Sequence, residues 1–251
     1  MVKSRWLGCG LYLLAALGVL LVLGLLLRPM SLAARRASGG NDAWELWRAC
    51  IAYAADHEGR LPPLDREPGR LMVDRDLMHD KYGVTGRYVT MEYDETAPFS
   101  WNAYDKDKGL RKNKDLIDDH SWWYLGYQVA SEDEALIFVK AYIRQVAAGK
   151  DIGPEFAPTE GDKQLPALQF PPDLLAEIAD AGHVEDTSLA KIPVFIERPG
   201  HYKGYSGGWV HYLDGHREYI DYPGRFPMTP RVVGMLQLLD DLGDIFKQPS
   251  E

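Results

Sequence analysis

Four polar residues near the C-terminal end of the 251-residue chain have side chains that can bind zinc or transfer protons. They are His201, His211, His216 and Glu218. A catalytic zinc ion needs three protein ligands that converge to within about 2.0–2.2 Å of the metal. If these side chains met, the chain would be a metal-dependent hydrolase, and we keep this as the alternative function. The simpler interpretation is that they face solvent or form a cross-strand ion pair, and it predicts no catalytic residue, no metal and no cofactor.

Other patterns that carry chemistry are missing or incomplete. The sequence contains no His-Glu-x-x-His, no P-loop and no dinucleotide-binding fingerprint. Residues 105–109 (Asp-Lys-Asp-Lys-Gly) resemble the opening of a calcium loop, but the closing glutamate is missing, so we expect a solvated charged loop. The aromatic run Trp122, Trp123 and Tyr124 allows a third hypothesis, a module that binds a small ligand or glycan. That hypothesis requires exposed rings.

The three C-terminal candidates lie in a predicted β-hairpin over residues 209–222. Two alternating runs flank Asp214-Gly215, a pair of residues that tolerates the positive φ angles of a two-residue type I′ turn. Such a turn makes His211 face Glu218 and Trp209 face Ile220. The register therefore predicts that the histidine and the glutamate share one face of the hairpin.

Hydrophobic periodicity predicts the elements that must position this hairpin. Apolar residues recur at helical spacing in some segments and alternate in others. A serine and a glutamate three residues later, Ser131 and Glu134, form a capping box at the start of the clearest helix. We expect helices at 42–58, 71–78, 132–148, 172–181 and from 230 onward, and strands at 87–93, 121–129 and 192–197. The predicted fold class is α+β, with an antiparallel sheet, flanking helices and a C-terminal helix.

The N-terminal stretch 6–27 has no charged residue and is rich in leucine. A run of this length matches a hydrocarbon core of roughly 30 Å, whereas the apolar part of a signal peptide is usually about 7–15 residues long. We therefore expect residues 1–28 to be a transmembrane signal anchor, 29–40 a juxtamembrane linker and 41–251 an extracytoplasmic domain. Cleavage after residue 33 stays open as an alternative, and the balance of basic residues on the two sides does not decide the topology.

Charge limits the partners of the chain. The net charge is −9, and every charged residue up to Arg36 is basic. The body is therefore acidic, which argues against nucleic acid because phosphates attract a positive surface. The basic N-terminal part suits anionic lipid headgroups. We expect the lipid bilayer and other envelope proteins as partners.

Two segments of this sequence resemble a known family. The residues His57-Glu58-Gly59-Arg60-Leu61-Pro62 after a helix, and residues 207–219 with His201 upstream of Asp214-Gly215, are similar to bacterial pilin-like proteins related to the major pseudopilins of type II secretion. The N-terminal apolar run agrees with this likeness. The chain departs from the family in its anchor, which has no recognisable prepilin cleavage motif and no acidic residue.

The resemblance implies a pilin-like head that faces away from the cytoplasm. Together with the apolar run, it predicts a single-pass protein of the bacterial inner membrane and cell envelope. Its expected role is non-enzymatic, through protein contacts in secretion or surface assembly. Whether such a protein is processed or forms oligomers is left open by the sequence.

Overall fold

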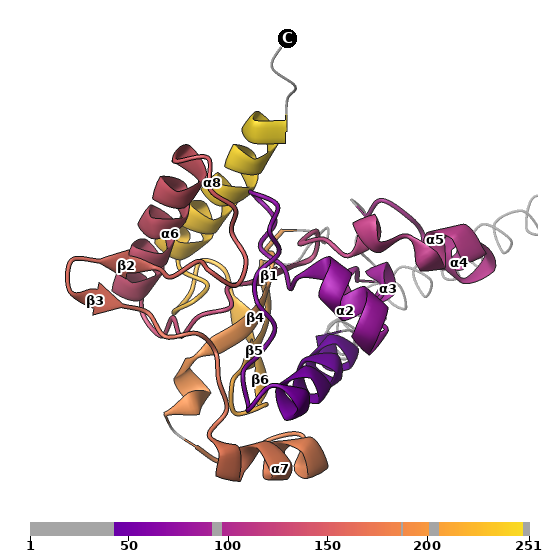
Figure 1. Ribbon diagram of the computed structural model, residues 1–251, viewed down its shortest axis with the longest axis horizontal. Coiled ribbons are helices and arrows are strands. Elements are labelled where there is room, and N and C mark those ends of the chain that lie inside the picture. The colour runs from indigo at the N-terminus through magenta and orange to yellow at the C-terminus, as the bar shows by residue number, and fades with distance from the viewer. Residues whose placement is uncertain (1–42, 92–96, 187, 201–205, 248–251) are drawn as a thin grey trace, which may run out of the picture. The chain divides into compact units, whose positions relative to one another are not determined.

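The computed structural model describes residues 43–91, 97–186, 188–200 and 206–247, all within a unit that spans residues 40–251 (Figure 1). These residues form an α+β arrangement that begins with a helix over residues 43–56. The elements that follow it are α2 (Arg75–Tyr82), α3 (Gly86–Val89), α4 (Trp101–Lys106), α5 (Lys108–Lys112), η1 (Lys114–Leu116), β1 (Trp122–Tyr124), α6 (Glu132–Ala147), β2 (Thr159–Glu160), β3 (Lys163–Gln164), α7 (Pro172–Ala181), η2 (Leu189–Lys191), β4 (Pro193–Glu197), β5 (Gly207–Tyr212), β6 (Arg217–Asp221) and α8 (Pro230–Lys247).

The larger sheet is antiparallel, with the strand order β1-β4-β5-β6. Every residue of β1 and β4 is buried, so both faces of this half of the sheet are covered. Figure 1 shows α6 and α8 beside each other on one side of the strands, and α2 with the helix of residues 43–56 on the other. The strand prediction for 192–197 is confirmed, and Pro193 opens β4, where a missing N–H does not interrupt a ladder.

The first helix buries one of its sides in the core. Leu46, Trp47, Cys50 and Ala54 are all at most 1% exposed, and the Trp47 ring meets Phe170 edge-on at 5.6 Å between centroids. The two tryptophans of this helix therefore contribute to the core, since Trp44 is also partly buried against it.

Local capping signals place two further helices correctly. The Ser131 hydroxyl accepts a hydrogen bond from Glu134 N, and the Glu134 carboxylate accepts one from Ala130 N, so both ends of the predicted capping box are used. Thr229 likewise accepts from Val232 N at the start of α8. These bonds satisfy N–H groups that have no partner within the helix.

Three predictions for the middle of the chain are wrong in type or extent. Residues 87–91, the described part of the strand expected at 87–93, do not form a strand: α3 covers Gly86–Val89. Val89, Thr90 and Met91 are all buried, so the alternating residue types do not mark a buried and an exposed face. The helix expected at 71–78 lies at Arg75–Tyr82, because the Asp74 side chain caps it by accepting from Leu77 N. The strand expected over 121–129 is shortened to β1 because Gly126 has a φ of 71°.

The C-terminal hairpin is present, but its register differs from the predicted one by one residue. Tyr212 N donates to His216 O and Gly215 N donates to Tyr212 O, which leaves three residues in the loop. As a result His211 faces Arg217 and Trp209 faces Tyr219. The cause is tertiary: Leu213 is fully buried, and its N–H donates to Ile192 O in the neighbouring chain segment, so the first strand ends one residue earlier and the loop is one residue longer.

Gly215 allows a direct test of this turn. Its φ is 88°, and a Cβ atom there would overlap the carbonyl oxygen of Gly182 at the end of α7. We expect Gly215→Ala to lower the free energy of unfolding by at least about 2 kcal/mol, from the left-handed backbone and the clash together. The matched control is Gly149→Ala, since Gly149 has a φ of 65° but open space around it, and should cost only about 1 kcal/mol. Equal losses in urea unfolding would contradict the packing argument.

The expected transmembrane helix requires a correction. Its residues, 6–27, lie outside the described part of the chain. Within 43–91, 97–186, 188–200 and 206–247, no helix is both long enough and apolar enough to cross a bilayer. The longest described helix, α8, carries Arg231, Asp240 and Asp241, and each such charge costs about 2.5–3.5 kcal/mol at the bilayer centre. On this finding the predicted fold with a membrane-spanning helix is corrected to the α+β fold of the described residues, and the single-pass inner-membrane localisation drawn from it is not carried further.

Candidate functional site

The hairpin register separates His211 from Glu218, two residues of the metal site that we kept as the alternative. Directly opposed residues share a face, and faces alternate along a strand, so His211 and Glu218 point to opposite sides of the sheet. His201 lies outside the described residues. Among those that are described, no group of three or more His, Cys, Asp and Glu side chains could hold a metal ion.

Each described member of that set also has a local role. His211 is 1% exposed, and its ring lies 5.7 Å from that of Trp122. The ring of His216 stacks on Tyr212 at 4.3 Å, with its Nδ1 2.5 Å from Asp214 Oδ1. Glu218 accepts a hydrogen bond from the Tyr212 hydroxyl at 2.6 Å. These contacts hold the hairpin together: His216 and Glu218 both contact Tyr212, whereas His211 lies on the opposite face.

Two other sequence candidates have structural roles. Trp122, Trp123 and Tyr124 are 0% exposed, which removes the only support for a ligand module built on their rings. In the calcium-like segment, Asp107 caps α5 by accepting from Gly109 N and Leu110 N. Its oxygens thus cap a helix. The charged loop expected at 105–109 is instead the junction of α4 and α5, with Asp107 between the two helices.

The structure places a large groove where the sequence suggested no site. It has a volume of about 1040 Å³, at the upper end of the range for ligand pockets. Five separate chain segments form it, and its lining residues are Tyr53, Asp56, His57, Glu58, Arg60, Leu61, Pro62, Pro63, Leu64, Arg66, Asp74, Asp76, Leu77, Asp80, Lys81, Gly126, Tyr127, Pro154 and Ala167.

The apolar part of the groove combines an aromatic wall with a proline-rich floor. The rings of Tyr53 and His57, one helical turn apart, stack at 3.8 Å and 2° between planes, and Tyr82 meets Tyr53 at 5.4 Å. The His57 Nδ1 lies 2.7 Å from Tyr53 O, which fixes the ring. Pro62 and Pro63 follow in an extended segment and have no N–H of their own.

The helix that carries this wall ends in an unusual backbone conformation. Glu58 has a φ of 55°, the one described non-glycine residue in the left-handed region, and Gly59 follows with 82°. Gly59 N donates to Ala54 O, and a Cβ atom at Gly59 would lie 2.5 Å from Phe170 O. The tight stop turns the chain directly from the helix into the floor of the groove.

The charged residues at the edge of the groove are held in pairs. Lys81 Nζ lies 3.2 Å from Asp56, and the hydroxyl of Tyr82 donates to the same carboxylate. The Tyr82 hydrogen bond, followed by Lys81, lowers the pKa of Asp56 below its usual value. Further pairs join residues on the remaining edges: Arg60 with Glu58, Arg66 with Asp74, and Lys114 with Asp76.

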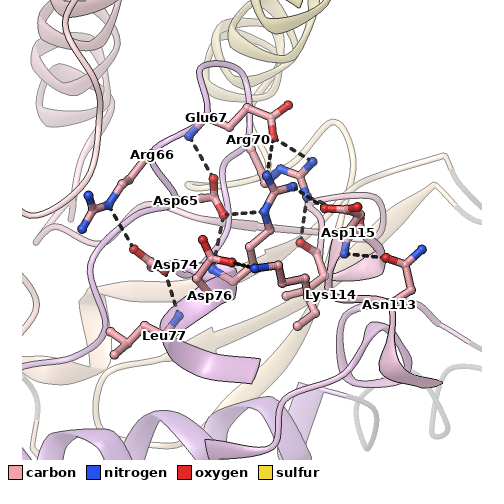
Figure 2. A network of polar contacts seen from close by, with 12 residues as sticks. Asp65, Arg66, Glu67, Arg70, Asp74, Asp76, Leu77, Asn113, Lys114 and Asp115 are labelled. Atoms are coloured by element: carbon pink, nitrogen blue, oxygen red, sulfur yellow. Dashed lines mark hydrogen bonds and ion pairs between the residues drawn. The ribbon is translucent and has the colours of Figure 1, made fainter. Parts of the chain in front are cut away.

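A polar network fixes one end of the groove (Figure 2). Arg75 lies between three carboxylates, at 3.9 Å from Asp65, 3.0 Å from Glu67 and 3.3 Å from Asp115. Asp65 also accepts from Glu67 N and Arg75 N, while burial raises its pKa. The network ties α2 to the segments on both sides of it, so the groove has rigid walls on this side.

A second charged cluster lies away from the groove, between α8 and the sheet. The Arg198 guanidinium is 3.0 Å from Asp119 and 3.0 Å from Asp240, and it stacks over Trp123. The Trp123 indole N–H donates to Asp240, and Leu71 N donates to Asp119. Burial and the neighbouring Asp119 raise the pKa of Asp240 to about 8, against the opposing effect of Arg198.

Sequence reasoning missed both clusters because their members are far apart in the chain. The signals that could have indicated the groove were the aromatic residues at the end of the first helix and the two prolines after it. We assigned the aromatic stripe to the core and used the prolines only as an exit turn. No protein-family model, curated protein or solved structure matches the chain.

Proposed function

We propose that this protein is non-enzymatic, has a pilin-like head, and acts through protein contacts in secretion or surface assembly. In this proposal the groove is the contact site, and its occupant is an extended segment of a partner protein. The likeness of residues 57–62 and 207–219 to pilin-like proteins supports the assignment to this class.

The observation that carries the proposal is the pairing of the charges around an apolar, aromatic groove. A general base needs a carboxylate or imidazole that is free to take a proton. In the groove Asp56, Asp74 and Asp76 each have a basic partner, and the pKa of Asp56 is lowered. Asp80 lies 3.0 Å from His79 Nδ1, and the His57 Nδ1 lies 2.7 Å from Tyr53 O. What is left for a ligand is a surface of rings, prolines and leucines with a polar edge, which is the composition of protein-binding sites.

The size and shape of the groove favour an extended chain. Its floor, residues 61–64, is itself extended, and its rings stand on the neighbouring helices. Rigid aromatic rings bind a partner at a low cost in conformational entropy, and tyrosine is enriched among residues that dominate binding energy.

Photo-crosslinking in the native host tests this function. A benzoylphenylalanine in place of Arg60, whose side chain is 65% exposed at the groove, should give a discrete adduct with a partner protein. The same residue in place of Arg231, which is 50% exposed on α8, is the control and should not give that adduct. Mass spectrometry should map the adduct to one contiguous partner segment.

A substitution in the aromatic wall provides the second half of this test. His57→Ala should weaken binding of the captured partner about tenfold or more, because an aromatic ring that lines the groove is lost. Tyr88→Ala, which removes a half-buried aromatic ring outside the groove, should leave binding unchanged. The proposal is wrong if Arg60 and Arg231 give the same adducts, or if the His57 and Tyr88 variants bind the partner equally well.

A further inference from the structure

The two short helices α4 and α5 present a basic surface on an acidic chain. Lys108, Arg111 and Lys112 follow at intervals of three and one, so they share one face of α5, and all three are exposed. No ion pair involves them within the described residues. We call these three residues the basic face. Figure 1 shows α4 and α5 at one edge of the molecule, beyond α2 and α3.

Helix α4, which directly precedes the basic face, is held in a defined position. Tyr104 of α4 is 2% exposed and packs on Phe99 at 4.8 Å. Trp101 donates to Thr90 O, and the guanidinium of Arg87 lies 4.6 Å from the centre of its ring and 2.9 Å from Asp105. A surface that is ordered before binding loses little conformational entropy when a partner docks.

A complementary surface lies on α7. Asp173, Glu177 and Asp180 are four and three residues apart, so they also share one helix face, and all are exposed. We call these three residues the acidic face. Ile178, on the other side of α7, is 0% exposed, so the helix turns its charged side outward. The helix contains no basic residue, and the described structure contains no ion pair to the acidic face.

Within one molecule the two faces cannot neutralise each other. Figure 1 shows α7 and α4–α5 at separate edges, with the helix of residues 43–56 and α2 between them. Between two molecules, however, the basic face of one copy matches the acidic face of the next in sign and in number of charges. We propose that this protein associates with itself head to tail through the basic face on α5 and the acidic face on α7.

Such an association is heterologous, because each copy uses two different surfaces. It leaves one face of each kind free at the ends of a dimer, and it therefore produces rings or open chains. The interaction is electrostatic and weakens as salt screens it. The groove takes no part in this association. A failure of the self-association would therefore not contradict the proposed function, and a failure of the proposed function would not contradict the self-association.

Sedimentation velocity of the full chain tests the proposal. The wild type should associate at about 50 mM salt and dissociate at about 500 mM, where the Debye length is only a few ångströms. Reversing the basic face (Lys108→Glu, Arg111→Glu, Lys112→Glu) should weaken the association at least about tenfold, as should reversing the acidic face (Asp173→Lys, Glu177→Lys, Asp180→Lys).

Mixing the two variants separates charge matching from loss of fold. Each variant alone has two faces of the same sign, but together their faces match, so a one-to-one mixture should associate. General attraction does not explain this result, because from a net charge of −9 three reversals leave either variant net negative. A control with the same change in charge, Arg48→Glu, Lys150→Glu and Arg231→Glu, should associate like the wild type.

Three results would overturn the proposal. The first is a wild type that stays monomeric at low salt. The second is association that persists in both reversed variants or at high salt, which would point to another surface. The third is a mixture of the two reversed variants that fails to associate.

Discussion

Replacing Arg198 by alanine is expected to lower the free energy of unfolding by about 3–5 kcal/mol near neutral pH, because it leaves buried negative charge without a cation. The guanidinium lies 3.0 Å from both Asp119 and Asp240, whose side chains are 14% and 18% exposed. It also covers the ring of Trp123. The loss should therefore appear in urea unfolding followed by tryptophan fluorescence.

A comparison within the same molecule makes this prediction specific. Arg231 joins α8 to α6 through Glu132, but its side chain is 50% exposed and the pair is 3.5 Å apart. Arg231→Ala should cost less than about 1 kcal/mol, the usual range for an exposed ion pair. Arg198→Lys keeps the charge but cannot hold two carboxylates in the same geometry, so its loss should be intermediate. Similar small losses in Arg198→Ala and Arg231→Ala would show that the cluster contributes little.

The second large effect expected is a fall in stability with rising pH, caused by Asp240. Its pKa in the folded protein is raised to about 8, mainly by burial, whereas an aspartate in an unfolded chain titrates near 3.9. Between these values the folded state holds a proton that the unfolded state has released. Stability is therefore fully present below about pH 4 and is lost as the pH rises towards about 8, by up to about 1.4 kcal/mol for each pH unit.

The amide variant Asp240→Asn should remove this slope. Asparagine has nearly the same shape and cannot ionise, so the folded and unfolded states no longer differ in proton binding at this position. Unfolding curves between about pH 5 and about pH 8 should then be flatter than those of the wild type. Asp241→Asn, the change at the exposed neighbouring residue, serves as the control and should retain the wild-type slope. A slope that persists in Asp240→Asn would assign the pH dependence to another group.

The two predictions concern the same contact between α8 and the sheet. Arg198→Ala should be more harmful at about pH 8 than at about pH 5, because protonation at low pH relieves part of the repulsion between Asp119 and Asp240. The pH dependence of the Arg198→Ala effect therefore checks both predictions together, since both depend on the Arg198 guanidinium and on the protonation of Asp240.

Local rules in the sequence located much of the fold. Helix α6 follows from a capping box and an apolar stripe, and both depend on residues within one or two helical turns. The position of the C-terminal turn follows from Asp214-Gly215, and the start of α8 from Thr229-Pro230. In each case the residues that make the decisive interaction are only a few positions apart, so a short stretch of sequence is enough to predict the element.

Contacts between distant segments decided what local rules could not. The hairpin register depends on a hydrogen bond from Leu213 N to Ile192 O and on the burial of Leu213, and that one-residue difference separates His211 from Glu218. The alternation over 87–93 suggested a strand, but residues 86–89 form a helical turn, in which Gly86 packs so closely on Leu116 that a Cβ atom would lie 2.6 Å from the Leu116 Cβ.

The sequence by itself determined the α+β class, the acidic charge and the places where most helices and turns begin. Only the tertiary structure decided which side chains meet, including the groove, the cluster around Arg198 and the separation of the basic and acidic faces. The physical reason is the distance along the chain over which each kind of interaction acts. Capping and periodicity act within a few residues, whereas Asp119, Arg198 and Asp240 come together only because the sheet and α8 pack into one core.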